Sequence, residues 1–313
     1  MRPPVRLRPA LALFAIVMAA SACSGGGKPT ATGPPDSLKV LCGGSTNVNL
    51  ISTQTPMNPG KNEFSFGLIT DTGGVVSGGA PQVWLAKDEA TSATGPAPAV
   101  WYPFAPASSF NDTAPRTALP GTYAANLDIP SVGNWIVGVL VNQGSTLLCG
   151  KASLAATDQP VPAPIGSKAI SVKTPVATTE RELRKIDTRD PPSPLHYISL
   201  DKALKNGKPT VVTFATPLLC TSQLCGPVVD EVLLVFEKIG AAKANFIHVE
   251  EFLPGDDFTP PPATLENQSP GFKAYGFTTE PWTLVINADG IITARFEGPV
   301  TAAMVEAALQ PLL

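Results

Sequence analysis

Two cysteines in the stretch Cys220-Thr-Ser-Gln-Leu-Cys225 are the side chains of this chain best suited to chemistry. They directly follow the apolar run 211–215, and a helical pattern beginning at Pro227 comes next. Thiol–disulfide chemistry uses such a strand, cysteine loop and helix, because the N–H groups and the positive dipole end of the helix stabilise a thiolate. The pair is therefore either a reactive dithiol or a structural disulfide.

The N-terminal segment predicts the compartment. Three arginines precede the apolar run 10–20, which has signal-peptide length and is too short to be a comfortable membrane span. The sequence Ala20-Ser-Ala-Cys23, followed by Ser-Gly-Gly-Gly, resembles the lipobox of bacterial lipoproteins. We therefore predict a lipoprotein signal peptide at 1–22, lipid modification of Cys23, and anchoring to the extracytoplasmic face of the bacterial cell membrane. The alternative is an ordinary secretory signal with an incidental cysteine, and both readings export the chain.

Export makes the remaining cysteines informative. Without Cys23 the chain has four cysteines, an even number in an oxidising compartment. Four cysteines allow three pairings, and proximity in the sequence favours Cys220 with Cys225. This leaves Cys42 with Cys149, for which we predict a structural disulfide.

Four segments follow the signal peptide. Residues 23–36 form a predicted flexible tether, and residues 37–156 show short strands separated by turn residues with no long amphipathic helix. That pattern predicts an antiparallel β-sandwich, loosely similar to small extracytoplasmic Ig-like domains. Residues 157–194 are a predicted Pro-rich linker. Residues 195–313 alternate strands and helices in a β-α-β / β-β-α order, which indicates an α/β domain.

In this last segment the hydrophobic pattern places each element. Pro227 is expected at the first helical position of the helix after the cysteines. Strands are predicted at 195–198, 209–215, 244–250, 282–286 and 291–296, and helices at 200–207, 227–239, 272–275 and 301–312.

Residues 195–313 resemble a thioredoxin-like domain, close to the extracytoplasmic thioredoxins. The resemblance rests on Gly207-Lys-Pro-Thr-Val-Val-Thr-Phe-Ala, the cysteine loop, Glu280-Pro-Trp-Thr-Leu-Val-Ile and Asp289-Gly. It implies a cis peptide bond before Pro281, facing the cysteines and helping to bind an extended peptide. The fold class expected for the whole chain is an α/β thioredoxin-like domain preceded by an all-β Ig-like sandwich.

The cysteine spacing departs from the family pattern. The usual motif has two residues between its cysteines, whereas this chain has four. Counting from the strand puts Cys220 at the nucleophile position. Matching Cys225-Gly-Pro-Val instead puts Cys225 there, with Val228 at the place of the resolving cysteine. The sequence leaves both alignments open.

A second departure concerns proton transfer. Thioredoxins commonly carry a buried acid in the strand before the cysteines, and the matching position here is Thr213. A hydroxyl cannot replace a carboxylate as proton acceptor, so exchange would depend on water or on Asp230 and Glu231. This departure strengthens the alternative of a structural disulfide.

The predicted activity is thiol–disulfide exchange with exported proteins through Cys220 and Cys225, without a cofactor. A non-catalytic binding or assembly lipoprotein with a structural disulfide is the alternative. A copper chaperone that uses the cysteines with His196 or His248 is a further one. The net charge of −3 and the lack of a basic stretch argue against nucleic acid as a partner.

Overall fold

The computed structural model describes residues 33–313 apart from 45, 53–54, 111–119 and 255–262. The predicted signal peptide, Cys23 and most of the tether lie outside the described residues. By their contacts, residues 31–313 cluster as one compact unit. In the described part of the chain, no helix is both long enough and apolar enough to span a membrane.

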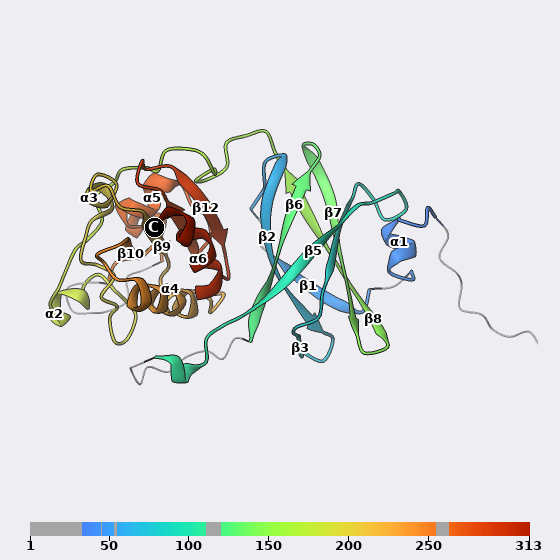
Figure 1. The fold of residues 1–313 in the computed structure, drawn as a ribbon, viewed down its shortest axis with the longest axis horizontal. Helices are drawn as coiled ribbons and strands as arrows, with labels where there is room; N and C mark the ends of the chain where they lie inside the picture. Colours follow the sequence, from blue (N-terminus) through green and yellow to red (C-terminus); the bar gives the residue numbers. More distant parts are fainter. Residues whose placement is uncertain (1–32, 45, 53–54, 111–119, 255–262) are drawn as a thin grey trace, which may run out of the picture. The chain divides into compact units, whose positions relative to one another are not determined.

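The first half of this unit is an antiparallel sheet (Figure 1). The neighbour order is β1-β2-β6-β5-β4-β7-β8, with β3 paired to β2. The elements are α1 Leu38–Leu41, β1 Val48–Ser52, β2 Gly60–Thr70, β3 Val75–Val76, β4 Gln82–Ala86, β5 Thr94–Pro103, η1 Ala107–Ser109, β6 Gly121–Ile129, β7 Gly133–Gln143 and β8 Thr146–Ala156.

Strand β5 joins the two parts of this sheet, because its first residues pair with β4 and its last residues pair with β6. The free edges β1 and β8 approach each other: the Asn47 N–H donates to the Cys149 carbonyl at 3.0 Å, and the Met57 N–H donates to the Ala155 carbonyl at 3.0 Å. The sheet is therefore nearly closed around one apolar core. Alternate residues of β2 point into that core, as the period of two requires.

The sequence analysis did not place a strand at β5. The segment contains Pro96, Pro98 and Pro103, and proline cannot donate to a ladder, so its composition argues against a strand. Two of the prolines occupy tolerated positions, because Pro96 falls in the β-bulge of the β4–β5 pairing and Pro103 is the last residue of the strand.

The second half is a four-stranded mixed sheet with helices. Its order is β10-β9-β11-β12, in which β9 and β10 run parallel and β11 is antiparallel to β9 and β12. The elements are α2 Glu180–Leu183, α3 Leu200–Ala203, β9 Thr210–Phe214, α4 Cys225–Ile239, β10 Asn245–Val249, η2 Leu265–Asn267, α5 Pro270–Tyr275, β11 Trp282–Ile286, β12 Ile292–Glu297, α6 Ala302–Leu309 and η3 Gln310–Leu312.

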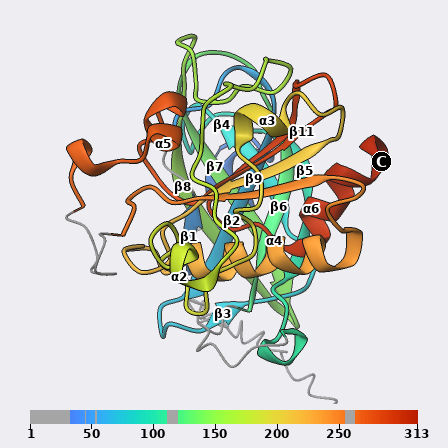
Figure 2. The same ribbon diagram turned by 90° about the vertical axis from the view of Figure 1, so that its left-hand side faces the viewer.

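Both faces of the four-stranded sheet are covered (Figure 2). Helices α4 and α6 pack on the face that presents Val211 and Phe246. The opposite face presents Val212 and Phe214 and is covered by α3, α5 and part of the Pro-rich segment. Strands β9, β10 and β11 are buried along their whole length, which explains their nearly continuous apolar sequences.

Three expectations are corrected. Residues 195–198 form turns and bends instead of a strand, although the Leu195 carbonyl accepts from the His248 N–H at 2.8 Å. The predicted helix at 200–207 is helical only over Leu200–Ala203 and then continues as a turn. Helix α4 begins at Cys225 rather than Pro227, because a proline in the first helical turn needs no N–H partner.

The Pro-rich segment 157–194 does more than connect. Ala163, Ala169 and Val172 pack against the four-stranded sheet. The Ala169 N–H donates to the Gly290 carbonyl at 2.9 Å, and an isolated bridge joins Lys168 to Ile291. Much of the predicted linker is thus part of the packed second half.

Candidate functional site

Cys220 and Cys225 form a disulfide at the point where the chain passes from β9 to α4. Their Cα atoms are 6.0 Å apart. Cys225 is the first residue of α4 and is completely buried, whereas Cys220 is only partly buried in the preceding loop. The sulfur of Cys220 is therefore the one that a partner can approach.

Two polar groups surround the Cys220 sulfur. The backbone N–H of Cys225, at the N-terminus of α4, donates to Cys220 Sγ at 3.3 Å, and the Ser222 hydroxyl lies 3.2 Å from the same sulfur. In the reduced protein, a negative sulfur at Cys220 would keep these two groups as donors. Because hydrogen bonds and a helix N-terminus lower a thiol pKa, this geometry favours the alignment that makes Cys220 the nucleophile.

Glu280 supplies a carboxyl group beside the disulfide. One of its carboxylate oxygens and the sulfurs of Cys220 and Cys225 all lie within 4.8 Å of one another. Burial raises the pKa of Glu280 to about 8, and the charge of Glu251 adds to this, while hydrogen bonds with Thr216 act in the opposite direction.

Pro281 lies next to this carboxyl group. The peptide bond between Glu280 and Pro281 is cis, at the start of β11. The sequence analysis chose Pro281 from the family resemblance, and it did not predict that Glu280 would reach the sulfurs.

The acids that the sequence suggested for proton transfer have other partners. Asp230 forms a buried ion pair with Arg189 at 2.8 Å. The Glu231 carboxylate accepts from the backbone N–H groups of Ala105 and Ala302, each at 2.6 Å. Thr213 contacts the Thr283 hydroxyl at 3.0 Å. The described structure thus groups Glu280 with the cysteine sulfurs, whereas Asp230 and Glu231 bind other partners.

Both histidines belong to a separate buried cluster. His196 Nε2 lies 3.1 Å and His248 Nδ1 3.4 Å from Asp187 Oδ2, and the Ser193 N–H also donates to this oxygen at 2.7 Å. His248 Nε2 lies 2.9 Å from the Ala215 carbonyl. The cluster is a hydrogen-bond network that joins the Pro-rich segment to β10.

The two groups of potential metal ligands in the described residues are distinct. One contains Asp187 with the histidines, and the other contains Glu280 with the cysteines. In the first, both histidines contact Asp187 inside the core, and His196 Nδ1 is buried without a hydrogen bond among the described residues. In the second, the sulfurs are joined to each other. The histidines do not join the cysteines, so the Cys–Cys–His arrangement of the copper hypothesis is not assembled.

Asp187 and Arg189 escaped the sequence analysis because they lie in a Pro-rich, charged stretch that has the composition of a solvated linker. The only signal was the run Asp187-Thr-Arg-Asp-Pro-Pro, which places charges next to the first histidine in the sequence. Their burial is set by long-range packing, which local composition does not report.

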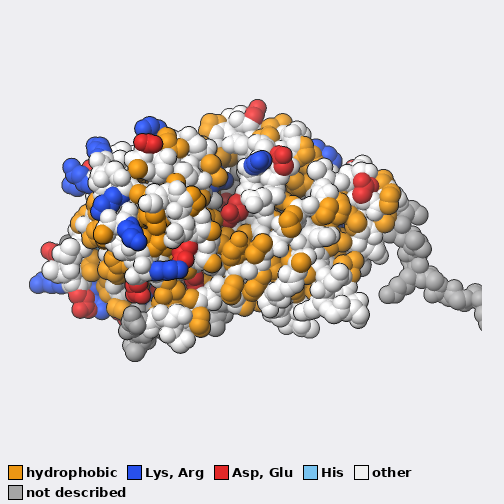
Figure 3. Space-filling model, viewed as in Figure 1, with side chains coloured by type: hydrophobic (Ala, Val, Ile, Leu, Met, Phe, Trp, Pro, Cys, Tyr) orange, Lys and Arg blue, Asp and Glu red, His pale blue; other side chains and the backbone are white. Residues whose placement is uncertain are grey.

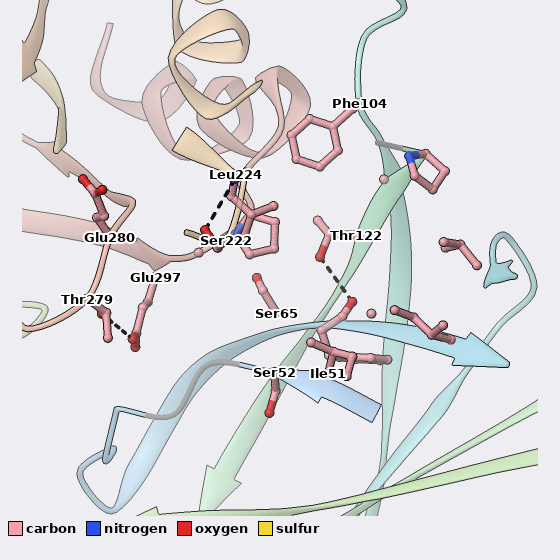
Figure 4. A pocket seen from close by; sticks show the side chains of 18 residues that line it. Ile51, Ser52, Ser65, Phe104, Thr122, Ser222, Leu224, Thr279, Glu280 and Glu297 are labelled. Atoms are coloured by element: carbon pink, nitrogen blue, oxygen red, sulfur yellow. Dashed lines mark hydrogen bonds between the residues drawn. The ribbon is translucent and has the colours of Figure 1, made fainter. Parts of the chain in front are cut away.

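A pocket of about 380 Å³ borders the cysteine loop (Figure 4). Its walls are mostly apolar, with hydroxyl and carboxyl groups between them. The lining includes Ile51, Ser65, Phe66, Ile69, Val75, Phe104, Ser222, Leu224, Thr279, Glu280 and Glu297. The pocket thus places apolar surface next to the residues that surround the disulfide.

One face of the molecule carries charges of both signs. Acidic and basic side chains are interspersed on the face shown in Figure 3, between apolar ones.

The Cys42–Cys149 disulfide lies away from this site, between the end of α1 and β8. Both cysteines are buried and pack with Leu140. It ties together residues 107 positions apart in the sequence.

No known family model matches this chain, and no curated protein matches it. Among solved structures, it is similar to a thiol:disulfide interchange protein of the thioredoxin family from Chlorobium tepidum TLS. The identity is 19% and the TM-score is 0.29, with 46% of this chain and 99% of that chain covered. A similarity this low does not indicate a function.

Proposed function

We propose that this chain is a membrane-anchored, extracytoplasmic thiol–disulfide exchange protein whose reactive pair is Cys220 and Cys225. The proposal includes a thioredoxin-like domain at 195–313 and an Ig-like domain at 37–156. One observation carries it: the partly exposed Cys220 sulfur receives a hydrogen bond from the first N–H of α4, while its partner sulfur is buried. A purely structural disulfide needs neither the donors nor this difference in access.

The exchange uses a mixed disulfide. In the reducing direction, the Cys220 thiolate attacks one sulfur of a partner's disulfide and releases the other as a thiolate. The Cys225 sulfur then attacks Cys220, which frees the second partner sulfur and closes the Cys220–Cys225 bond. Two electrons pass to the partner, and the reverse sequence oxidises a partner dithiol.

The proposed partners are thiols and disulfides of exported proteins. A cysteine in a folded protein is usually flanked by apolar residues, and the pocket beside the loop offers apolar walls at Leu224 and Phe104. The side chains of Ser222 and Thr279 add hydroxyl groups to the lining of this pocket. This surface suits an extended, partly apolar segment of a partner polypeptide.

Equilibration with glutathione tests the proposal. The redox state of Cys220 and Cys225 is measured by thiol labelling and mass spectrometry across glutathione buffers. A reduction potential well below about −300 mV would mark a structural bond and sink the proposal, whereas a higher value supports exchange.

An insulin-reduction assay supplies the activity. We expect turnover by the wild type, none by Cys220→Ser, and normal turnover by Thr221→Ala, a matched control in the same exposed loop. The absence of wild-type turnover in both the reducing and the oxidising direction would refute the enzymatic reading.

The membrane anchor has its own test. If Cys23 carries a lipid, Cys23→Ala moves the protein from the membrane fraction to the soluble exported fraction. Retention of the variant in the membrane fraction would contradict lipid anchoring at this residue.

A further inference from the structure

We propose that Glu280 is the proton donor and acceptor of the Cys220–Cys225 pair, in the place of the acid that Thr213 cannot provide. The inference rests on the proposed exchange function. It assigns the role to a residue that lies just before β11, instead of a residue in the strand before the cysteines. Its basis is the position of the Glu280 carboxyl group. One carboxylate oxygen of Glu280 and the two cysteine sulfurs all lie within 4.8 Å of one another.

The distance suits proton transfer. A carboxyl oxygen within 4.8 Å of a sulfur reaches it through one water molecule or after a small side-chain rotation. One Glu280 oxygen, Oε2, is buried and makes no hydrogen bond within the described structure. A buried carboxyl oxygen without a partner is costly unless the group is neutral or gains a partner during reaction.

The surroundings of Glu280 keep the group close to the point of proton exchange. Its pKa is raised to about 8 by burial and by Glu251, so the carboxyl group holds a proton at neutral pH and releases it on mild alkalinisation. Glu250 lies within charge range and carries a pKa raised by burial and by Asp187. The charge that acts on Glu280 is thus that of another acid, Glu251, and it favours the protonated form.

The other acids on these elements are occupied. Glu250 accepts from the Thr188 N–H at 2.7 Å, and Glu251 accepts from the Gln268 side chain at 2.7 Å. Asp230 and Glu231 hold Arg189 and two backbone N–H groups, as described above. Among these acids, Glu280 is the one whose carboxylate oxygen lies within 4.8 Å of both cysteine sulfurs.

The proton balance of each step is closed. When a partner thiolate attacks Cys220 in the disulfide, the S–S bond breaks and the Cys225 sulfur leaves with the electron pair. Glu280 gives its proton to that sulfur and becomes a carboxylate. In the reverse step, the carboxylate takes the proton from the Cys225 thiol, and the resulting thiolate attacks Cys220 and releases the partner's thiolate.

The test follows the second step alone. A mixed disulfide between Cys220 and glutathione is prepared on the reduced full-length protein in metal-free buffer, and the release of glutathione is followed against pH. We compare the wild type with Glu280→Gln, with the conservative Glu280→Asp, and with Glu237→Gln. The last is a matched control, because it removes the same charge from an exposed site on α4.

We expect Glu280→Gln to release glutathione about 100-fold more slowly at neutral pH, because general acid–base catalysis contributes factors of this order. The deficit should shrink at alkaline pH, where the Cys225 thiol ionises without help. Glu280→Asp should recover part of the rate, and Glu237→Gln should behave as the wild type. Equal rates and pH profiles for the wild type and Glu280→Gln would overturn the inference while leaving the exchange function intact.

A second measurement does not need turnover. The thiolate absorbance of the reduced protein is titrated in the wild type and in Glu280→Gln. Because the Glu280 carboxylate disfavours a nearby thiolate, its removal should lower the apparent pKa of Cys225. Identical titrations would contradict the inference, even in a protein that proves to have no exchange activity.

Discussion

The backbone N–H of Cys225 points at the sulfur of Cys220, from a distance of 3.3 Å. The residue that closes the disulfide thus also stabilises the sulfur to which it is bonded. On reduction, the same N–H becomes a donor to a thiolate at the positive end of α4. The two cysteines are therefore unequal before any partner arrives.

This inequality predicts the order of reaction with alkylating agents. In the reduced protein, Cys220 should be alkylated before Cys225, because it is accessible and two donors can stabilise its thiolate. Mass spectrometry of partly alkylated protein measures the order. Ser222→Ala should slow alkylation of Cys220 by roughly two- to tenfold, since one donor to the thiolate is lost. Faster labelling of the buried Cys225 would contradict the assignment.

The disulfide between Cys42 and Cys149 should be a major source of stability. In the chain-entropy model, a cross-link over 107 positions stabilises the folded state by about 4–5 kcal/mol. The double variant Cys42→Ala/Cys149→Ala should lose an amount of this order in urea unfolding. Glutathione equilibration of Cys220 and Cys225 serves as the control, because their loop lies outside the first sheet. A loss below about 1 kcal/mol would contradict a structural role for the bond.

The buried ion pair between Arg189 and Asp230 should be sensitive to removal of one partner. Arg189→Met removes the ion-pair partner of the buried Asp230 carboxylate, and the expected loss of unfolding free energy is about 3–5 kcal/mol. The double variant Arg189→Met/Asp230→Leu should recover a large part of this loss, because neither charge remains. Denaturant unfolding of the four proteins in the cycle measures the coupling. Additive losses would show that the two charges do not stabilise each other.

Glu63 should make the protein less stable as the pH rises. Burial raises its pKa from 4.5 to about 7, so between these values the folded protein holds a proton that the unfolded chain has released. Stability contributed by a raised pKa is complete below the unfolded value and is lost as the pH passes through the folded value. Glu63→Gln should therefore gain stability relative to the wild type above about pH 7. Melting temperatures of both proteins across this range test it, and a parallel pH dependence would refute it.

Local patterns in the sequence predicted most of the second sheet. The apolar runs that became β9, β10 and β11 are buried on both faces, and such runs are typical of central strands. The cysteine pairing followed from spacing and from the compartment. The predicted strand at 195–198 was wrong, because a short apolar run beside a sheet edge has the same composition as a strand.

The groups around the site could not be predicted in the same way. Glu280 reaches the sulfurs from an element about 60 positions away in the sequence, and no spacing rule reports such proximity. Asp187 lies in a Pro-rich stretch whose composition indicates a solvent-exposed linker. The positions of Glu280 and Asp187 depend on tertiary packing between segments that are far apart in the sequence.

The packing of the Pro-rich segment determines where the shortest fragment of the second half that folds by itself should begin. A fragment starting at Leu195 would uncover the sheet face under Ala163, deprive both histidines of Asp187 and remove Arg189, the ion-pair partner of Asp230. Truncation at Leu195 would therefore remove structural support that lies upstream of Cys220, Cys225 and Glu280 in the sequence. A self-sufficient fragment of the second half should therefore begin near Val161, where the Pro-rich segment first becomes buried.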